Sequence, residues 1–165
     1  MTKSKIIKEE QITSYPISKG CHAMCYGHPT NPRKVLLKTR CKVRKHMARK
    51  DLPNSSYFPN VRKVGTTQFR SIYEMDKYIH IDNTNSYKLS KLDHKIYTYL
   101  TNELNGYKDD ISKSKVLPQH IKKLLLTSYA ILKRQKYDVC FDITDKNIMM
   151  TKSGKLVLND VFWIE

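Results

Sequence analysis

The segment from Tyr137 to Glu165, around which the rest of the chain is organised, reads YDVCFDITDKNIMMTKSGKLVLNDVFWIE. It predicts a short apolar strand, a polar loop, and two further short strands around a Lys-Ser-Gly-Lys turn. Asp142 and Asn147 lie in the loop, and Asp160 follows the last of these strands. A hairpin that returns beside the loop would bring all three side chains to one edge. Their oxygens suit a hard cation whose shell is completed by phosphate oxygens.

This segment resembles the catalytic loop and metal-binding aspartate of the protein-kinase-like fold, in which Asp-x-x-x-x-Asn is followed by a hairpin and a second Asp. The resemblance implies that Asp142 is the catalytic aspartate. It also implies that Asn147 and Asp160 bind the metal. The Asn-Ile-Met-Met run and the short C-terminal part are most similar to small kinase-like proteins of bacteriophages. The alternative interpretation is an ordinary polar hairpin.

Motifs upstream extend the resemblance to a nucleotide site. Gly20 matches the middle glycine of the glycine-rich loop, whose flanking glycines are replaced here. Lys38 matches the strand lysine that pairs with the α- and β-phosphates. By the same analogy, Glu74 to Asp76 form the hinge whose backbone groups contact adenine. Taken alone, a lysine that ends an apolar strand, as Lys38 does, is usually a solvated strand end.

The expected fold class is α+β, a minimal protein-kinase-like fold of two lobes in one domain. Its small lobe, at about residues 11–78, would be an antiparallel sheet. The strands and the helix expected there cover residues 15–20, 23–27, 35–39 and 40–50. The segment 56–65 would lead into a fourth strand, and 68–78 would form the fifth. The reduced second lobe, residues 79–165, would hold two amphipathic helices that begin near Tyr87 and Pro118, followed by the hairpin.

The resemblance implies binding of ATP and Mg²⁺, with ATP between the strand layer and the two helices. Asp142 would then accept or orient the proton of an incoming hydroxyl during transfer of the γ-phosphoryl group. The expected substrate is a protein, and a phage-encoded enzyme of this kind would act on host factors.

Several departures from the family pattern favour a second hypothesis. No acidic residue occurs between Lys38 and Asp51, so either Asp51 replaces the helix glutamate or that ion pair is absent. The usual His-Arg before the catalytic aspartate is Cys140-Phe141. The sequence ends five residues after Asp160, without an activation segment or a peptide-binding subdomain. The alternative function is therefore a catalytically inactive kinase-derived binding protein or inhibitor.

Charge indicates which partners such a binder would prefer. The formal net charge is +16, and seven of the thirteen residues from Lys38 to Lys50 are Lys or Arg. This field favours an acidic host protein, or nucleic acid bound through the Lys38–Lys50 stretch. A solvated basic face is the simpler interpretation of the same residues.

The remaining features concern compartment and metal. The sequence shows no apolar segment long enough to span a bilayer and no export signal, so a cytoplasmic protein is expected, in the host cytoplasm if the protein is viral. Its four cysteines would then be reduced thiols. Cys21, Cys25 and Cys41, with nearby histidines, also leave a zinc site open as an alternative.

Overall fold

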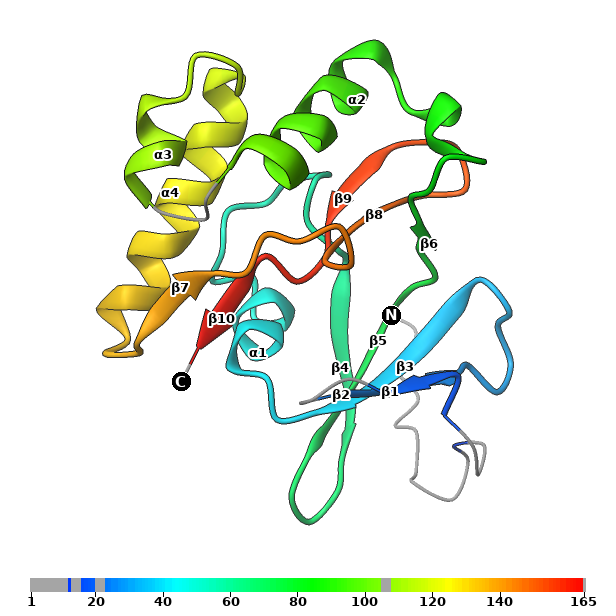
Figure 1. The fold of residues 1–165 in the computed structure, drawn as a ribbon. Coiled ribbons are helices and arrows are strands. Elements are labelled where there is room, and N and C mark those ends of the chain that lie inside the picture. The colour runs from blue at the N-terminus through cyan, green and yellow to red at the C-terminus, as the bar shows by residue number, and fades with distance from the viewer. Residues whose placement is uncertain (1–11, 13–15, 20–22, 105–107, 165) are drawn as a thin grey trace. The chain divides into compact units, whose positions relative to one another are not determined.

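The computed structural model describes residue 12 and residues 16–19, 23–104 and 108–164. Across these residues the protein is an α+β structure with antiparallel sheets and a few helices (Figure 1), which confirms the α+β part of the expectation. The chain divides into two compact units. The first unit comprises the described residues up to Asp51 together with Asn60–Lys77, and the second comprises Leu52–Pro59 and the described residues from Tyr78 onward.

The first unit is built on a five-stranded antiparallel sheet with the strand order β1-β2-β3-β5-β4. One helix, α1 (Lys42–Ala48), lies between β3 and β4 in the sequence. The strands are β1 (Ser18–Lys19), β2 (Ala23–Gly27), β3 (Lys34–Thr39), β4 (Val61–Thr66) and β5 (Ser71–Asp76).

The core of this sheet explains why these segments form strands. Leu36 of β3 and Ile72 of β5 are completely buried, and they pack with Tyr26 and Val64 in one cluster. Apolar side chains of neighbouring strands therefore share one face of the sheet. Helix α1 is shorter than the predicted 40–50 because the backbone of Lys50 adopts a φ of 60° just beyond it, which ends the helix.

The second unit combines helices with two small antiparallel sheets. Its helices are the 3-10 helix η2 (Ser86–Lys88), α2 (Lys91–Thr98), the π-helix η3 (Tyr99–Glu103), α3 (Lys108–Lys113) and α4 (Gln119–Arg134). One sheet pairs β7 (Val139–Phe141) with β10 (Phe162–Ile164), and the other has the order β6 (Ile79–His80), β8 (Ile148–Met150), β9 (Leu156–Leu158). No helix of the described residues is both long and apolar enough to cross a membrane.

Helix α2 differs from the prediction that placed its start near Tyr87. It begins at Lys91 because the Ser90 hydroxyl caps it, accepting the N–H of Asp93 at 3.0 Å. Leu92 belongs to the predicted apolar stripe but is 47% exposed, whereas Asp93 is buried. Asp93 is buried because its carboxylate accepts hydrogen bonds from the Tyr57 hydroxyl and the Leu156 N–H.

Helix α4 follows the predicted pattern closely. It starts directly after Pro118, whose carbonyl accepts the N–H groups of Ile121 and Lys122. The residues that α4 buries include four members of its predicted apolar stripe: Ile121, Leu124, Leu125 and Leu132.

The segment Leu52–Pro59 contributes to the second unit although it lies between α1 and β4 of the first in the sequence. The carbonyl of Tyr57 accepts the N–H of Leu158 at 2.7 Å, and its hydroxyl donates to Asp93 Oδ1 at 2.9 Å. The ring of Phe58 lies 6.2 Å from that of Phe162. This segment therefore joins α2 to the strands that carry the candidate site.

Candidate functional site

Backbone hydrogen bonds hold the loop at Asp142 against the end of the hairpin. The Asp142 N–H donates to the carbonyl of Val161 at 2.9 Å, which extends the β7–β10 pairing by one step. The carbonyl of Asn147 accepts the N–H groups of Asn159 at 2.9 Å and Asp160 at 3.1 Å. The structure therefore brings the backbones at Asp142, Asn147 and Asp160 together.

The side chain of Asn147 completes this arrangement. Its Nδ2 donates to the backbone carbonyl of Asp142 at 2.8 Å. Because the two arms of an amide diverge, this bond directs Oδ1 of Asn147 away from the Asp142 carbonyl. The loop thereby fixes the direction of Asn147 Oδ1. Asp160, whose N–H donates to the Asn147 carbonyl, adds a carboxylate to the same edge.

The donor set at this edge is of a kind that hard cations prefer. It consists of carboxylate and amide oxygens, which are hard ligands. Among the described residues, no group of three His, Cys, Asp or Glu side chains could hold a metal ion by itself. Mg²⁺ is commonly bound by one or two carboxylates plus phosphate oxygens and waters. Binding of Mg²⁺ at this edge stays a prediction.

An aromatic cluster that the sequence reasoning missed supports both strands of the site. We define it as Phe58, Tyr129, Phe141 and Phe162. The ring of Phe141 stacks on Tyr129 at 5.2 Å and lies 5.3 Å from Phe162. Phe141, at the position where the kinase resemblance would place an arginine, contributes apolar packing beside Asp142. The signal was present in the sequence, since a Phe lies within two positions of both Asp142 and Asp160.

The turn of the hairpin also depends on a distant contact. Gly154 has a φ of +82° and is buried, and a Cβ at this position would lie 2.1 Å from the carbonyl oxygen of Lys88. The turn between β8 and β9 therefore packs directly on backbone that precedes α2.

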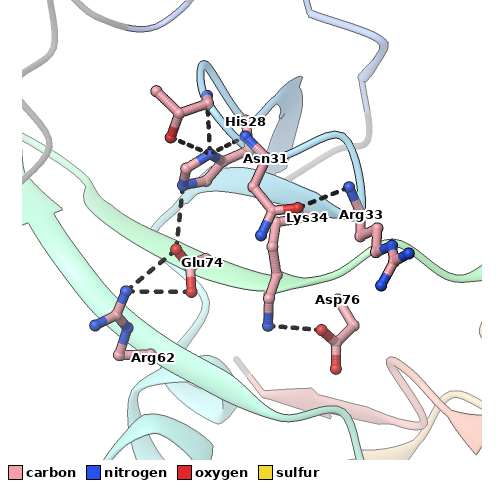
Figure 2. Close-up of polar contacts among 8 residues, drawn as sticks. His28, Asn31, Arg33, Lys34, Arg62, Glu74 and Asp76 are labelled. Carbon is pink, nitrogen blue, oxygen red and sulfur yellow. Dashed lines mark hydrogen bonds and ion pairs between the residues drawn. The ribbon is translucent and has the colours of Figure 1, made fainter.

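The predicted nucleotide residues Glu74 and Asp76 lie on β5 of the first unit. The Glu74 carboxylate contacts Nε2 of His28 at 3.1 Å and a terminal guanidinium nitrogen of Arg62 at 3.2 Å, and Lys34 Nζ lies 2.6 Å from Asp76 (Figure 2). These ion pairs link β5 to β3, to β4 and to the turn that follows β2. Contact of their backbone groups with adenine stays a prediction.

The orientation of His28 follows from its contacts. Its Nδ1 accepts the backbone N–H groups of Thr30 at 3.2 Å and Asn31 at 3.1 Å (Figure 2). The proton of the neutral ring is therefore on Nε2, which donates to Glu74. His28 thus folds the turn after β2 and fixes the Glu74 side chain at the same time.

Lys38 and Gly20 were the other residues predicted to contact phosphate. Lys38 lies near the end of β3, in register with Met24 of β2 and Ile72 of β5. Gly20 lies outside the described residues, as do Cys21 and His22 of the zinc alternative. The strands on either side of Gly20 pair antiparallel, with Ser18 opposite Cys25.

The structure gives Asp51 a local partner. Its Oδ2 lies 2.8 Å from Nδ1 of His46, a buried ring on α1. Asp51 was one candidate to replace the helix glutamate that pairs with the strand lysine. Its carboxylate instead pairs with His46 near the C-terminal end of α1.

Comparisons with known proteins add little to this geometry. No family model matches the sequence, and no curated protein sequence matches it. Among solved structures, the crystal structure of Cex1p aligns with a TM-score of 0.42 and 11% identity, over 89% of this chain and 25% of that chain. The chain therefore spans about a quarter of that structure's length. Values this low establish neither a shared fold nor a shared function.

Proposed function

We propose that this chain is a kinase-like protein that binds ATP with Mg²⁺ and transfers the γ-phosphoryl group to a protein hydroxyl. The observation that carries the proposal is the set of bonds at Asn147. Its carbonyl holds the backbone of Asp160, and its amide nitrogen holds the carbonyl of Asp142. An ordinary polar hairpin does not require these three oxygen-bearing residues to be linked in this way.

The order of elements in the first unit supports the same proposal. Three antiparallel strands are followed by α1 and then by β4 and β5, which is the order that the kinase resemblance predicts for a small lobe. Lys38 lies on the third strand, where kinases carry the phosphate-binding lysine.

Each residue has a defined role in this proposal. Asn147 and Asp160 would hold Mg²⁺, which when bound neutralises charge on the phosphate oxygens. Asp142 would accept the proton of the attacking hydroxyl, a contribution of about 10²–10⁴ in rate for a positioned general base. Lys38 would neutralise charge on the α- and β-phosphates.

The second candidate is a catalytically inactive kinase-derived binder. Two observations favour it: Phe141 occupies the position of the family's arginine, and Asp51 is engaged by His46. Such a protein would use its basic surface to bind an acidic host protein or nucleic acid. Action in a host cytoplasm and a bacteriophage origin belong to both proposals.

Thermal unfolding with and without Mg-ATP tests binding, and labelled γ-phosphate ATP incubated with host lysate tests transfer. We expect Mg-ATP to raise the melting temperature of the wild type, and Asn147→Ala and Asp160→Ala to lose that shift. Asp142→Ala should keep the shift while transfer falls about 10²- to 10⁴-fold. Asp145→Ala is the matched control, because Asp145 is an exposed carboxylate of the same loop.

The outcomes separate the two candidates. A thermal shift without transfer would support the inactive binder. No shift for the wild type with Mg-ATP would refute nucleotide binding, and an equal loss in Asp145→Ala would show that the loop tolerates no change of charge.

A further inference from the structure

A basic hollow lies in the first unit, where β3 ends, α1 begins and β4 turns into β5. Its volume is about 360 Å³. Four of the residues that line it are cationic: Arg40, Lys42, Lys45 and Arg70. None of its lining residues, all of which belong to the described part of the chain, is acidic. The hollow therefore concentrates positive potential that favours an anionic ligand.

An exposed aromatic ring projects from the same place. Phe69 lies in the turn between β4 and β5 and is 65% exposed. Arg40 holds this turn, since its Nε donates to the Phe69 carbonyl at 3.0 Å and its guanidinium carbon lies 5.8 Å from the ring centroid. The ring is thus supported from one direction and available to a ligand over most of its area.

The turn that carries Phe69 is itself well ordered by hydrogen bonds. The N–H of Thr67 donates to the Arg70 carbonyl at 2.7 Å, and the N–H of Arg70 donates to the Thr67 hydroxyl at 3.1 Å. A ring presented on a preorganised turn loses little conformational entropy when a planar group stacks on it.

Helix α1 adds cations beside the hollow. Lys42 and Lys45 are three positions apart, so they share one face of the helix, and both are exposed. The helix instead buries Val43, Arg44, His46 and Met47. The basic face is consequently separated from the core of the unit.

We propose that this hollow and the exposed face of α1 bind single-stranded nucleic acid, with a base stacked on Phe69 and the phosphates against the four cations. A positive groove beside an accessible aromatic ring is the combination that single strands recognise. A duplex keeps its bases stacked on one another, and an acidic protein gains only the charge attraction. The ring therefore distinguishes the single strand from both.

Fluorescence anisotropy with a labelled single-stranded DNA about 15 nucleotides long tests the stacking contact. Phe69→Ala should raise Kd about tenfold, and Phe69→Trp should retain affinity. The matched control is Tyr87→Ala, which removes a ring that is 76% exposed, with Lys88 Nζ 6.0 Å from its centroid, in the second unit. This control should bind like the wild type.

A pair of double variants tests the charged face. Lys42→Gln with Lys45→Gln should weaken binding and reduce the salt slope of log K by about 0.7 for each cation removed. Lys152→Gln with Lys155→Gln removes the same charge from the exposed turn of the hairpin and should have a smaller effect. Unchanged melting temperatures would show that every variant remains folded.

Three results would overturn the proposal. Equal losses of affinity in the two double variants would mean that the oligonucleotide responds only to the net charge of the protein. Equal affinity for duplex and single strand, with Phe69→Ala unaffected, would exclude stacking. Unchanged affinity in the Lys42→Gln, Lys45→Gln double variant would exclude the exposed face of α1 as a contact.

Discussion

Gly154 shows how a single residue can determine the geometry of the site. It combines a positive φ with the close approach of the Lys88 carbonyl, so both its backbone conformation and its missing side chain are required. The turn that contains it positions β8 and β9, the strands between Asn147 and Asp160. A change at Gly154 would therefore reach the candidate site through the hairpin.

We expect Gly154→Ala to lower the free energy of unfolding by about 2 kcal/mol or more, because Ala is strained at this φ and its Cβ meets backbone. Urea unfolding measures the change. Gly27→Ala is the control, since a Cβ there would meet only Ile17 Cδ1 at 3.9 Å, an ordinary contact. Equal effects of the two substitutions would contradict this account.

The same residue marks a limit of prediction from sequence. The Lys-Ser-Gly-Lys motif was sufficient to predict the turn, because Gly is favoured where φ is positive. Its contact with Lys88 was not predictable, since it joins residues far apart in the sequence without any local signal. The polar loop that carries Asp142 and Asn147, by contrast, was predictable from the local sequence, while the roles of these residues and of Asp160 stay predictions.

At the scale of elements, Asp93 and Tyr57 connect α2, β9 and the Leu52–Pro59 segment. Asp93 accepts the Tyr57 hydroxyl through Oδ1 and the N–H of Leu156 through Oδ2 at 3.3 Å. Burial, the hydrogen bond to Asp93 and its negative charge raise the pKa of Tyr57 to about 12. Ionisation of this hydroxyl would remove a donor that the buried carboxylate needs.

This raised pKa predicts a loss of stability at high pH. Unfolded Tyr57 loses its proton near pH 10, whereas the folded protein retains it until about pH 12. The stabilisation that the Tyr57 hydroxyl gives the folded protein is therefore fully present below pH 10 and is lost as the pH rises through about 12. Tyr57→Phe should lower the free energy of unfolding by about 1 kcal/mol at neutral pH.

Urea unfolding from pH 8 to 12 measures this effect. The difference between wild type and Tyr57→Phe should shrink above pH 10, while the exposed Tyr87→Phe should follow the wild type throughout. A difference that stays constant across this range would exclude the hydroxyl as its source.

Elements were predictable where the apolar residues formed a clear pattern. The helical stripe of α4 and the continuous apolar run of β3 are two such patterns. Helix α3 was missed because its six residues contain one apolar side chain, Ile111, which gives no periodicity. Asp93 was missed because a buried carboxylate depends on partners from Tyr57 and Leu156 that a local pattern does not reveal.

At the scale of the whole molecule, the two compact units are not two continuous pieces of chain. The polypeptide passes from the first unit to the second after Asp51, returns after Pro59 and passes again after Lys77. The sequence placed all of residues 11–78 in one lobe, since nothing local indicates that Leu52–Pro59 packs elsewhere. The units therefore share their chain more closely than the predicted division implies.

This interleaving predicts that residues 78–165 are unstable when produced alone. Without Tyr57 and Phe58, the fragment lacks the acceptor for the Leu158 N–H and one ring beside Phe162. We expect its melting temperature to rise by about 10 °C or more when residues 52–59 are fused to it through a flexible Gly/Ser linker. A fusion of the same eight residues in scrambled order is the control.

Circular dichroism during heating measures both fusions. Equal melting temperatures for the native and scrambled segments would show that the fragment does not use Leu52–Pro59.

The position of Leu52–Pro59 also affects how the protein is made. On the ribosome this segment is synthesised about 100 residues before Leu156–Leu158 and Phe162, its partners. At about 5–20 residues per second, Tyr57 and Phe58 wait about 5–20 s before those partners exist. Until those partners are synthesised, the rings of Tyr57 and Phe58 lack the contacts that the folded protein gives them, and transiently exposed apolar surface of this kind is what chaperones protect.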